Sequence, residues 1–447
     1  MIKKFSILPL LIAASAANAT VNYKLDLSQP QHHLGQVSMT LDGGSANALV
    51  KLPAWRTGKY KILDLANGVR HFWAKDSAGQ TLTWQHHDKS SWLIDNPTKG
   101  AITVGYQIYA NQLGTRTRHI DDSHAYIDAT AVFMYEPARR DEDISVELTV
   151  PADWHSFSGM QATSAHHFVA PNYDVLADSP IETGINQVLN FKQDDKNYQL
   201  VIWGEGNYDA QQMAQDLKKM VGASQNIWQG YPFDDYVFMV HATTGVRGAT
   251  EHLNSTIIQR KRFTFAPRKE YLEFLKTAAH EFVHTWNVKA YRPKGVAHYD
   301  YQRENYTDLL WVSEGSTSYF QSQLLLQSGL ITQKEFFEDL AKRINSHLKK
   351  PGKHEQSVAQ SSHESWIALP GDFANNHSVN IYSEGFMASL ALDFKMLQDS
   401  KLKAGYSELH RELFNQFRLP KPFDSHDIQA LAKSLTGKDY SQWWQQN

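Results

Sequence analysis

The stretch TAAHEFVHTWNVK, residues 277–289, lies inside a longer apolar pattern of helical period. Across residues 268–287 the apolar side chains recur at steps of three and four, which predicts one amphipathic helix with a continuous buried face. His280 and His284 are four residues apart, so both imidazoles lie on one side of this helix, one turn from each other. Glu281 lies one step round, at the edge of the same side.

Two histidines and a glutamate in this H-E-x-x-H spacing are typical of a catalytic zinc site. Such a site uses three protein ligands, leaves one position open for water, and keeps a carboxylate near that water but off the metal. His280 and His284 would supply two ligands, and Glu281 would act as the general base. The chain holds 21 histidines, so accident alone can also produce the motif.

Glu314, in the apolar stretch LLWVSEGSTSYF, is the candidate for the third ligand. A second helix that crosses the first would bring its carboxylate to the metal. An ionised carboxylate among so many apolar residues is costly to bury unless a positive group faces it, and a zinc ion would be that group. The alternative is a glutamate on a solvated helix face.

The first half of the chain has a different period. In residues 20–203 apolar and polar positions alternate, as at Val21, Tyr23 and Leu25, and glycine-containing turns separate the alternating runs. Beyond this region the period lengthens toward 3.6. We therefore predict an α+β multidomain chain, with an N-terminal β-sandwich in residues 20–203 and a mainly α-helical domain in residues 204–447.

Residues 1–19 have the pattern of a signal peptide. Lys3 and Lys4 precede a short apolar run, and Ala-Asn-Ala ends the segment as a small-x-small cleavage site, so we expect the mature chain to begin at Thr20. The run is shorter than the roughly 18 apolar residues of a membrane anchor. We expect export to the periplasm, with secretion past the outer membrane as the alternative.

The composition narrows the choice of partners. The chain has 447 residues and no cysteine, which excludes disulfides and a lipid anchor on cysteine. No later stretch is long and apolar enough to predict stable membrane insertion after signal cleavage. The net charge is −3, without a basic block, and gives no reason to expect nucleic acid. The expected partners are peptides, and the sequence does not indicate an oligomeric state.

Four stretches resemble segments of the glycyl aminopeptidase family of gluzincin metallopeptidases, and they occur in the same order along the chain as in that family. They are GATEHLNS from Gly248, HEFVHTWNVKAYRP from His280, LLWVSEGSTSYF from Leu309 and IYSEGFMASLALDF from Ile381. Weaker likeness extends to LPAWRTGKY, DSPIETG and SVAQSSHESW, so the resemblance covers nearly all of the expected mature chain. It implies an N-terminal β domain and a thermolysin-like catalytic domain.

The resemblance also implies roles for single residues. Glu314 would be the third zinc ligand, and the hydroxyl of Tyr382 would stabilise the oxygen that becomes negative in the transition state. Glu251, in the segment that begins at Gly248, is similar to the glutamate that binds a free α-ammonium group in related aminopeptidases. Gly248 and Glu251 are therefore the candidate substrate-binding residues.

Two features depart from the family pattern. Glu384 stands where relatives commonly carry lysine, although Tyr382 is retained. The sequence ends at LTGKDYSQWWQQN, which looks like the end of a catalytic domain, so the PDZ domain that usually follows is expected to be absent. Neither departure touches the expected zinc ligands.

Taken with the motifs, the resemblance implies an aminopeptidase with one Zn²⁺ per chain that hydrolyses N-terminal residues from peptides. A zinc-activated water would attack the peptide bond, and Glu281 would be its general base. The preference for small N-terminal residues such as glycine or alanine comes from the resemblance alone. One alternative is an endopeptidase on the same site. Another is a non-catalytic binding protein with a structural zinc, which the presence of a candidate base argues against.

Overall fold

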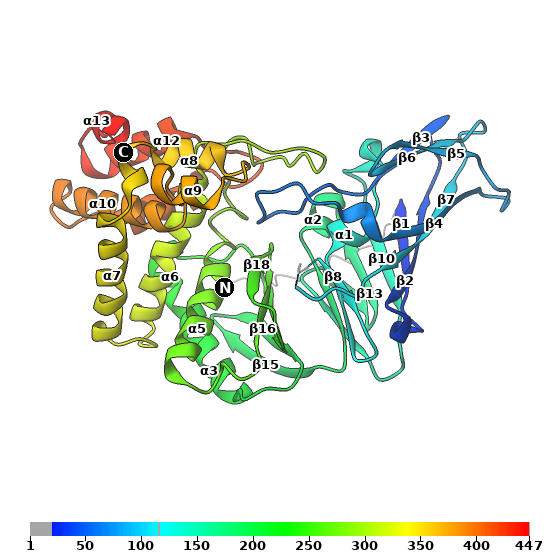
Figure 1. Cartoon of the computed structure of the whole chain (residues 1–447), viewed down its shortest axis with the longest axis horizontal. Coiled ribbons are helices and arrows are strands. Elements are labelled where there is room, and N and C mark those ends of the chain that lie inside the picture. Colours follow the sequence, from blue (N-terminus) through cyan, green and yellow to red (C-terminus); the bar gives the residue numbers. More distant parts are fainter. Residues whose placement is uncertain (1–19, 115–116, 447) are drawn as a thin grey trace, which may run out of the picture.

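The computed structural model describes residues 20–114 and 117–446. The expected signal peptide, residues 1–19, lies outside the described residues. Figure 1 shows a β-rich part, blue to cyan, beside a part that carries most of the helices, green to red. This arrangement confirms the predicted fold class of a β-rich first domain followed by a mainly helical one. None of the helices in the described ranges is long and apolar enough to cross a membrane.

Within the described residues, the first domain contains three sheets. A seven-stranded sheet has the order β12-β13-β10-β1-β2-β7-β4, a four-stranded sheet the order β11-β14-β9-β8, and a three-stranded sheet the order β3-β6-β5. Val21, Tyr23 and Leu25 of β1 are buried, and the residues between them are more exposed, so the predicted alternation reflects one face on the core.

The strands of the first domain have the following bounds: β1 (Val21–Asp26), β2 (Leu34–Leu41), β3 (Asn47–Lys51), β4 (Val69–Asp76), β5 (Trp84–Asp88), β6 (Ser91–Asp95), β7 (Ile102–Tyr109), β8 (Arg118–Ile120), β9 (His124–Ile127), β10 (Ile144–Thr149), β11 (His155–Ser158), β12 (Gln161–Ser164), β13 (His167–Ala170) and β14 (Ile181–Gly184). Two short helices, α1 (Ala129–Val132) and α2 (Tyr173–Ala177), lie between strands.

The second domain begins with a five-stranded sheet of order β15-β16-β17-β19-β18. Its strands are β15 (Gln187–Gln193), β16 (Lys196–Trp203), β17 (Asp235–Thr243), β18 (Gly248–Glu251) and β19 (Ser255–Lys261). Strands β15 and β16 precede Gly204, yet β16 pairs in parallel with β17. Because one sheet crosses the expected boundary at Gly204, we propose that the domains divide between β14 and β15.

Helices form the rest of this domain. They are α3 (Ala210–Ala223), α4 (Gln225–Trp228), α5 (Arg268–Val283), α6 (Ser316–Gln327), α7 (Gln333–Leu348), α8 (Val358–Glu364), α9 (Gly371–His377), α10 (Ser383–Asp399), α11 (Tyr406–Gln416), α12 (Ser425–Thr436) and α13 (Ser441–Gln446), with a π-helical turn, η4 (Trp311–Gly315), directly before α6. Most of the apolar side of α5 is buried in the large core that these helices share, and Leu272 at its N-terminal end is partly buried.

The two domains meet across apolar surfaces. Tyr126 of β9 forms a small buried cluster with Val201, Met239 and Ile257 of the five-stranded sheet. A loop of the second domain also enters the core of the first, where Tyr299, Tyr301 and Val296 are buried. A loop of the first domain also contacts the second directly, where the hydroxyl of Tyr60 donates to Glu314.

Candidate metal centre and catalytic site

His280 and His284, on the last turn of α5 and directly after it, point their Nε2 atoms at one place. The Nδ1 atom of His284 lies 2.9 Å from the carbonyl oxygen of Asn287, and the Nδ1 atom of His280 lies 3.0 Å from Oε1 of Gln321. Both partners are acceptors, so each Nδ1 donates and each Nε2 keeps its lone pair. The two Nε2 atoms are 3.1 Å apart.

Glu314 completes the group. Its Oε2 atom lies 3.5 Å from Nε2 of His280 and 3.3 Å from Nε2 of His284. Ligand atoms bonded to one tetrahedral zinc ion at about 2.0–2.1 Å are about 3.3–3.4 Å from each other. The three side chains therefore have the donor types and the separations that a zinc ion requires. They are the three predicted ligands, and the structure brings them together.

The π-helical turn η4 and Asn287 set the position of Glu314. A π turn is wider than an α-helical turn and leaves carbonyl groups without their usual partners. The side-chain amide of Asn287 donates to the carbonyl oxygens of Val312 and Ser313 at 2.8 and 3.2 Å. The backbone carbonyl oxygen of Asn287 accepts a hydrogen bond from Nδ1 of His284. One asparagine thus connects the segments that carry all three candidate ligands.

The first domain reaches the same group through Tyr60. Its hydroxyl donates to Oε1 of Glu314 at 2.6 Å, which leaves Oε2 for the histidines. Burial opposes ionisation of Glu314, but the neighbouring imidazoles of His284 and His280 outweigh burial and lower its pKa. Burial also lowers the pKa of His284, yet the charges of Glu314 and Glu251 outweigh it and raise that pKa. The site therefore attracts positive charge, as a metal site must.

Glu281 and Glu251 also lie close to His284. One oxygen of each carboxylate and a ring nitrogen of His284 lie within 4.8 Å of one another. Both glutamates are buried. Glu251 ends β18, an edge strand of the five-stranded sheet, and Gly248 begins it. Two carboxylates that the sequence separates by 30 positions thus meet beside one candidate ligand.

Gly58 explains how the first domain approaches Glu251. Its φ is +71°, and a Cβ atom at this position would lie 2.5 Å from an oxygen of the Glu251 carboxylate. Any larger residue would be strained and would displace that carboxylate. The loop that carries Gly58 and Tyr60 therefore forms one wall of the site.

Tyr382 lies just before α10, on the open side of the site. Its ring centroid is 6.1 Å from that of His280, and the residue is 37% exposed. Desolvation, together with the carboxylates of Glu314, Glu251 and Glu281, raises the pKa of Tyr382 well above its usual value. The phenol therefore stays protonated and can donate a hydrogen bond. A hollow of about 300 Å³ lies beside it, bordered by Tyr60.

Two glycines allow α10 to place Tyr382 here. A Cβ atom on Gly315 would lie 2.4 Å from Cα of Gly385, and one on Gly385 would lie 2.8 Å from the carbonyl oxygen of Trp311. The start of α10 and the η4 turn thus touch backbone to backbone. Glu384, the departure from the family pattern, is buried and accepts a hydrogen bond from Nδ1 of His347.

The sequence motifs assign no role to Tyr60 or Gln321, and the family resemblance implies only that Asn287 lies at the wall of the site. Gln321 had a periodic signal, since it lies seven residues after Glu314 and so on the same helix face. Asn287 belongs to the quoted zinc-helix stretch. Tyr60 lies in LPAWRTGKY, and nothing in that stretch alone connects it with a glutamate 254 residues away.

A β-rich domain beside a helical domain with this ligand group defines a metallopeptidase of the aminopeptidase type. The Peptidase M61 N-terminal domain matches residues 22–185, and the M61 glycyl aminopeptidase domain matches residues 273–388. The chain belongs to the M61 glycyl aminopeptidase family.

Solved structures agree with this assignment. An aminopeptidase N family protein from Idiomarina loihiensis has a TM-score of 0.90 and 26% identity, over 95% of this chain and 75% of that chain. An M1 zinc metallopeptidase from Deinococcus radiodurans has a TM-score of 0.56 and 13% identity, over 93% of this chain and 90% of that chain, and shows the shared fold. A comparison with curated proteins found no match.

Proposed function

We propose that this protein is a zinc-dependent aminopeptidase that hydrolyses N-terminal residues from peptides. The observation that carries the proposal is the convergence of His280, His284 and Glu314 at separations of 3.1–3.5 Å, with two further carboxylates beside them. A structural zinc site fills its coordination with protein ligands and needs no base. Three ligands with Glu281 next to them fit hydrolysis better.

When bound, zinc would act as a Lewis acid on the scissile carbonyl and lower the pKa of water. Glu281 would take the proton from the attacking water and later pass one to the leaving amine. Tyr382, kept protonated by its surroundings, would donate a hydrogen bond to the carbonyl oxygen as negative charge develops there. The H-E-x-x-H spacing implies the role of Glu281, and the family resemblance implies the role of Tyr382.

Glu251 is proposed to bind the free α-ammonium group of the substrate. A buried carboxylate needs a cation, and the α-ammonium group of a peptide would be one. Because β18 is an edge strand, its backbone would also pair with an extended peptide that begins at Glu251. Binding of the α-ammonium group by Glu251 favours cleavage at the N-terminus, whereas strand pairing alone would also suit internal cleavage.

Substrate preference and location extend the proposal. A preference for small N-terminal residues such as glycine or alanine is supported by membership of the glycyl aminopeptidase family. Export to the periplasm is supported by the composition of residues 1–19. Each is a separate claim, and the zinc mechanism does not depend on either.

Replacement of the base tests the mechanism. Glu281→Gln is expected to keep the zinc content of the purified protein and to lower kcat for a glycyl or alanyl peptide by roughly 10²–10⁴-fold, because general-base catalysis contributes about that much. Zinc per chain and peptide hydrolysis would be measured on the same preparation. Equal turnover by the two proteins would remove Glu281 from the mechanism.

A further inference from the structure

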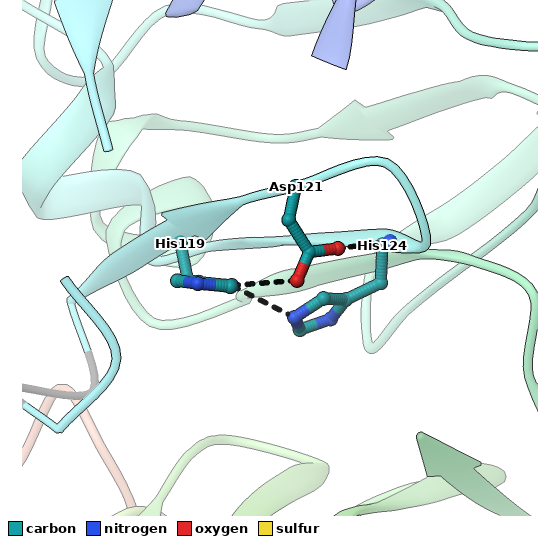
Figure 2. A group of neighbouring side chains, drawn as sticks. All are labelled: His119, Asp121 and His124. Atoms are coloured by element: carbon teal, nitrogen blue, oxygen red, sulfur yellow. Dashed lines mark hydrogen bonds and ion pairs between the residues drawn. The ribbon is translucent and has the colours of Figure 1, made fainter. Parts of the chain in front are cut away.

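A second group of candidate metal ligands lies on the β8–β9 hairpin. His119 of β8 pairs with Tyr126 of β9, and the backbone N–H of Asp121 donates to the carbonyl oxygen of His124 at 2.9 Å, which closes the hairpin. Opposed residues in an antiparallel pair share a face, as do residues two apart on one strand. His119, Asp121 and His124 therefore project from the same face, and Figure 2 shows their side chains gathered there.

The ligand atoms of this group are close together. Nδ1 of His119 lies 2.9 Å from Nε2 of His124 and 4.0 Å from Oδ2 of Asp121, and one ligand atom from each of the three residues lies within 4.8 Å of the others. Oδ1 of Asp121 accepts hydrogen bonds from the backbone N–H and hydroxyl of Ser123 at 2.8 and 2.7 Å. The turn thus holds the carboxylate by one oxygen and leaves the other directed at the histidines.

Glu182 fixes the orientation of His124. One oxygen of its carboxylate lies 2.9 Å from Nδ1 of His124, so this nitrogen donates and Nε2 keeps the lone pair that faces His119. The indole of Trp203 stacks on the same imidazole, with 3.6 Å between ring centroids. A carboxylate behind a ligating histidine is the usual support of a metal site, because it sets the tautomer and makes the ligand more basic.

The charges around this cluster also call for a cation. Glu182 is 1% exposed, and its second oxygen accepts from Nε2 of His241 at 2.9 Å. In the part of the chain that the structure describes, the ion-pair partners of Glu182 and Asp121 are all histidines. A divalent ion bound between His119, Asp121 and His124 would balance the negative charge of these carboxylates.

We propose that His119, Asp121 and His124 form a second binding site for a divalent metal ion of the zinc class. Two imidazoles and one carboxylate suit zinc and its neighbours among the transition metals, whereas calcium and magnesium prefer oxygen ligands alone. The side chain of Asp121 is 25% exposed, so water can reach the fourth position. The site shares no residue with the catalytic group.

The position of the cluster suggests what the ion does. His124 and Glu182 belong to the four-stranded sheet of the first domain, whereas Trp203 and His241 belong to the five-stranded sheet of the second. A metal on the hairpin would hold His124 in its stacked and hydrogen-bonded position. It would thereby strengthen the polar contact between the two sheets.

Metal counting on the full chain tests the site. The protein would be purified without a histidine tag, loaded with Zn²⁺, freed of excess ion and measured for zinc per chain. The chain has no cysteine, so thiols cannot add background. Two equivalents are expected in the unchanged protein and one in Asp121→Asn. Asp122→Asn removes the same charge from the exposed neighbouring position and is expected to keep two.

The variant Glu314→Gln distinguishes zinc bound by the catalytic group from zinc bound by the hairpin. This variant is expected to lose one equivalent and to retain the equivalent that Asp121→Asn removes, so failure of the proposed function and failure of this site give different counts. His119→Gln serves as a second hairpin variant, with circular dichroism as the check on folding. Anomalous scattering at the zinc edge from crystals of the unchanged protein needs no variant and is expected to give a peak between His119 and His124.

A single equivalent in the unchanged protein, absent from Glu314→Gln and retained in Asp121→Asn, would overturn the proposal. So would crystals whose anomalous peak lies at the catalytic group alone. Either result would support the competing arrangement, a hydrogen bond from His119 to His124 without metal.

Discussion

At the scale of single residues, the site gives two neighbouring glutamates different surroundings. Glu281 projects from the helix that carries the histidines, whereas Glu251 ends an edge strand beside which a peptide could lie. Both are near His284, so distance from the metal group alone does not assign their roles. We propose that the strand edge distinguishes them, because an extended substrate paired with β18 would bring its first residue to Glu251.

Glu251→Gln is therefore expected to act on substrate recognition rather than on metal binding. Removing one partner of a buried ion pair costs about 3–5 kcal/mol, so kcat/KM for a peptide with a free N-terminus should fall roughly 100-fold or more. Zinc content should stay unchanged. The acetylated form of the same peptide provides the control, because it has no α-ammonium group to lose. Unaltered preference for the free peptide would exclude Glu251 from the amine site.

Sequence spacing predicts His280 and His284 as ligands and Glu281 as the base, because one helical turn brings the three residues together. It cannot predict Tyr60, whose contact with Glu314 arises only when two separate domains dock. The supporting roles of Asn287 and Gln321 depend on which way their amide groups turn, and periodicity carries no such information. The sequence therefore predicts the candidate ligands better than it predicts the groups that orient them.

At the scale of secondary structure elements, the crossing of η4 with α10 controls the site geometry. Glu314 lies in η4, and Tyr382 immediately precedes α10. Gly315 and Gly385 let the two backbones approach so closely that a single Cβ atom would collide with main-chain atoms. The glycine three residues after Tyr382 thus has a packing explanation.

Gly385→Ala is expected to destabilise the protein by about 1–3 kcal/mol, the usual cost of overpacking, despite the better helix propensity of alanine. It should also lower kcat/KM, because the displaced helix carries Tyr382 away from the metal group. Urea unfolding and peptide hydrolysis would measure the two effects. Gly371→Ala is the matched control, since a Cβ atom there meets nothing within 4 Å. Similar behaviour of both variants would contradict the packing explanation.

The alternation of apolar and polar residues identifies β16 as a strand, but it does not show to which sheet the strand belongs. Strands of period two occur on both sides of the domain junction, and pairing partners distant in sequence leave no mark on local periodicity. This is why the expected boundary at Gly204 falls after β15 and β16, two strands of the sheet that also contains β17. A change from strand to helix period marks a change of element type, and a domain boundary need not coincide with it.

At the scale of the whole molecule, a buried ion pair joins the two domains behind the catalytic site. Nζ of Lys289 donates to Oδ1 of Asp178 at 2.8 Å, and both side chains are almost fully buried. Asp178 belongs to the first domain, and Lys289 follows the histidine motif of the second. His252, next to Glu251, contacts the same carboxylate at 3.2 Å. The relative position of the domains is thus coupled to residues that border the site.

Because of this ion pair, we expect the free energy of unfolding to depend on pH in the acid range. Burial raises the pKa of Asp178, but Lys289 and His252 outweigh it and lower the pKa from 3.8 to about 2. A folded-state pKa below the unfolded value means that this stabilisation is fully present above about pH 4 and is lost as the pH falls toward 2. The free energy of unfolding should decline through that window. Asp178→Asn should flatten the decline, and an equal slope in the variant would show that other carboxylates cause it.

A double-mutant cycle separates the ion pair from its surroundings. Asp178→Ala leaves Lys289 buried without its partner and should cost about 3–5 kcal/mol of unfolding free energy, with lowered peptide hydrolysis because the loop bearing Thr57 and Tyr60 shares this contact. Adding Lys289→Met removes the uncompensated charge and should restore much of the stability. Denaturant unfolding followed by tryptophan fluorescence would measure all four proteins. Strictly additive losses would mean that the two side chains do not stabilise the domain junction as a pair.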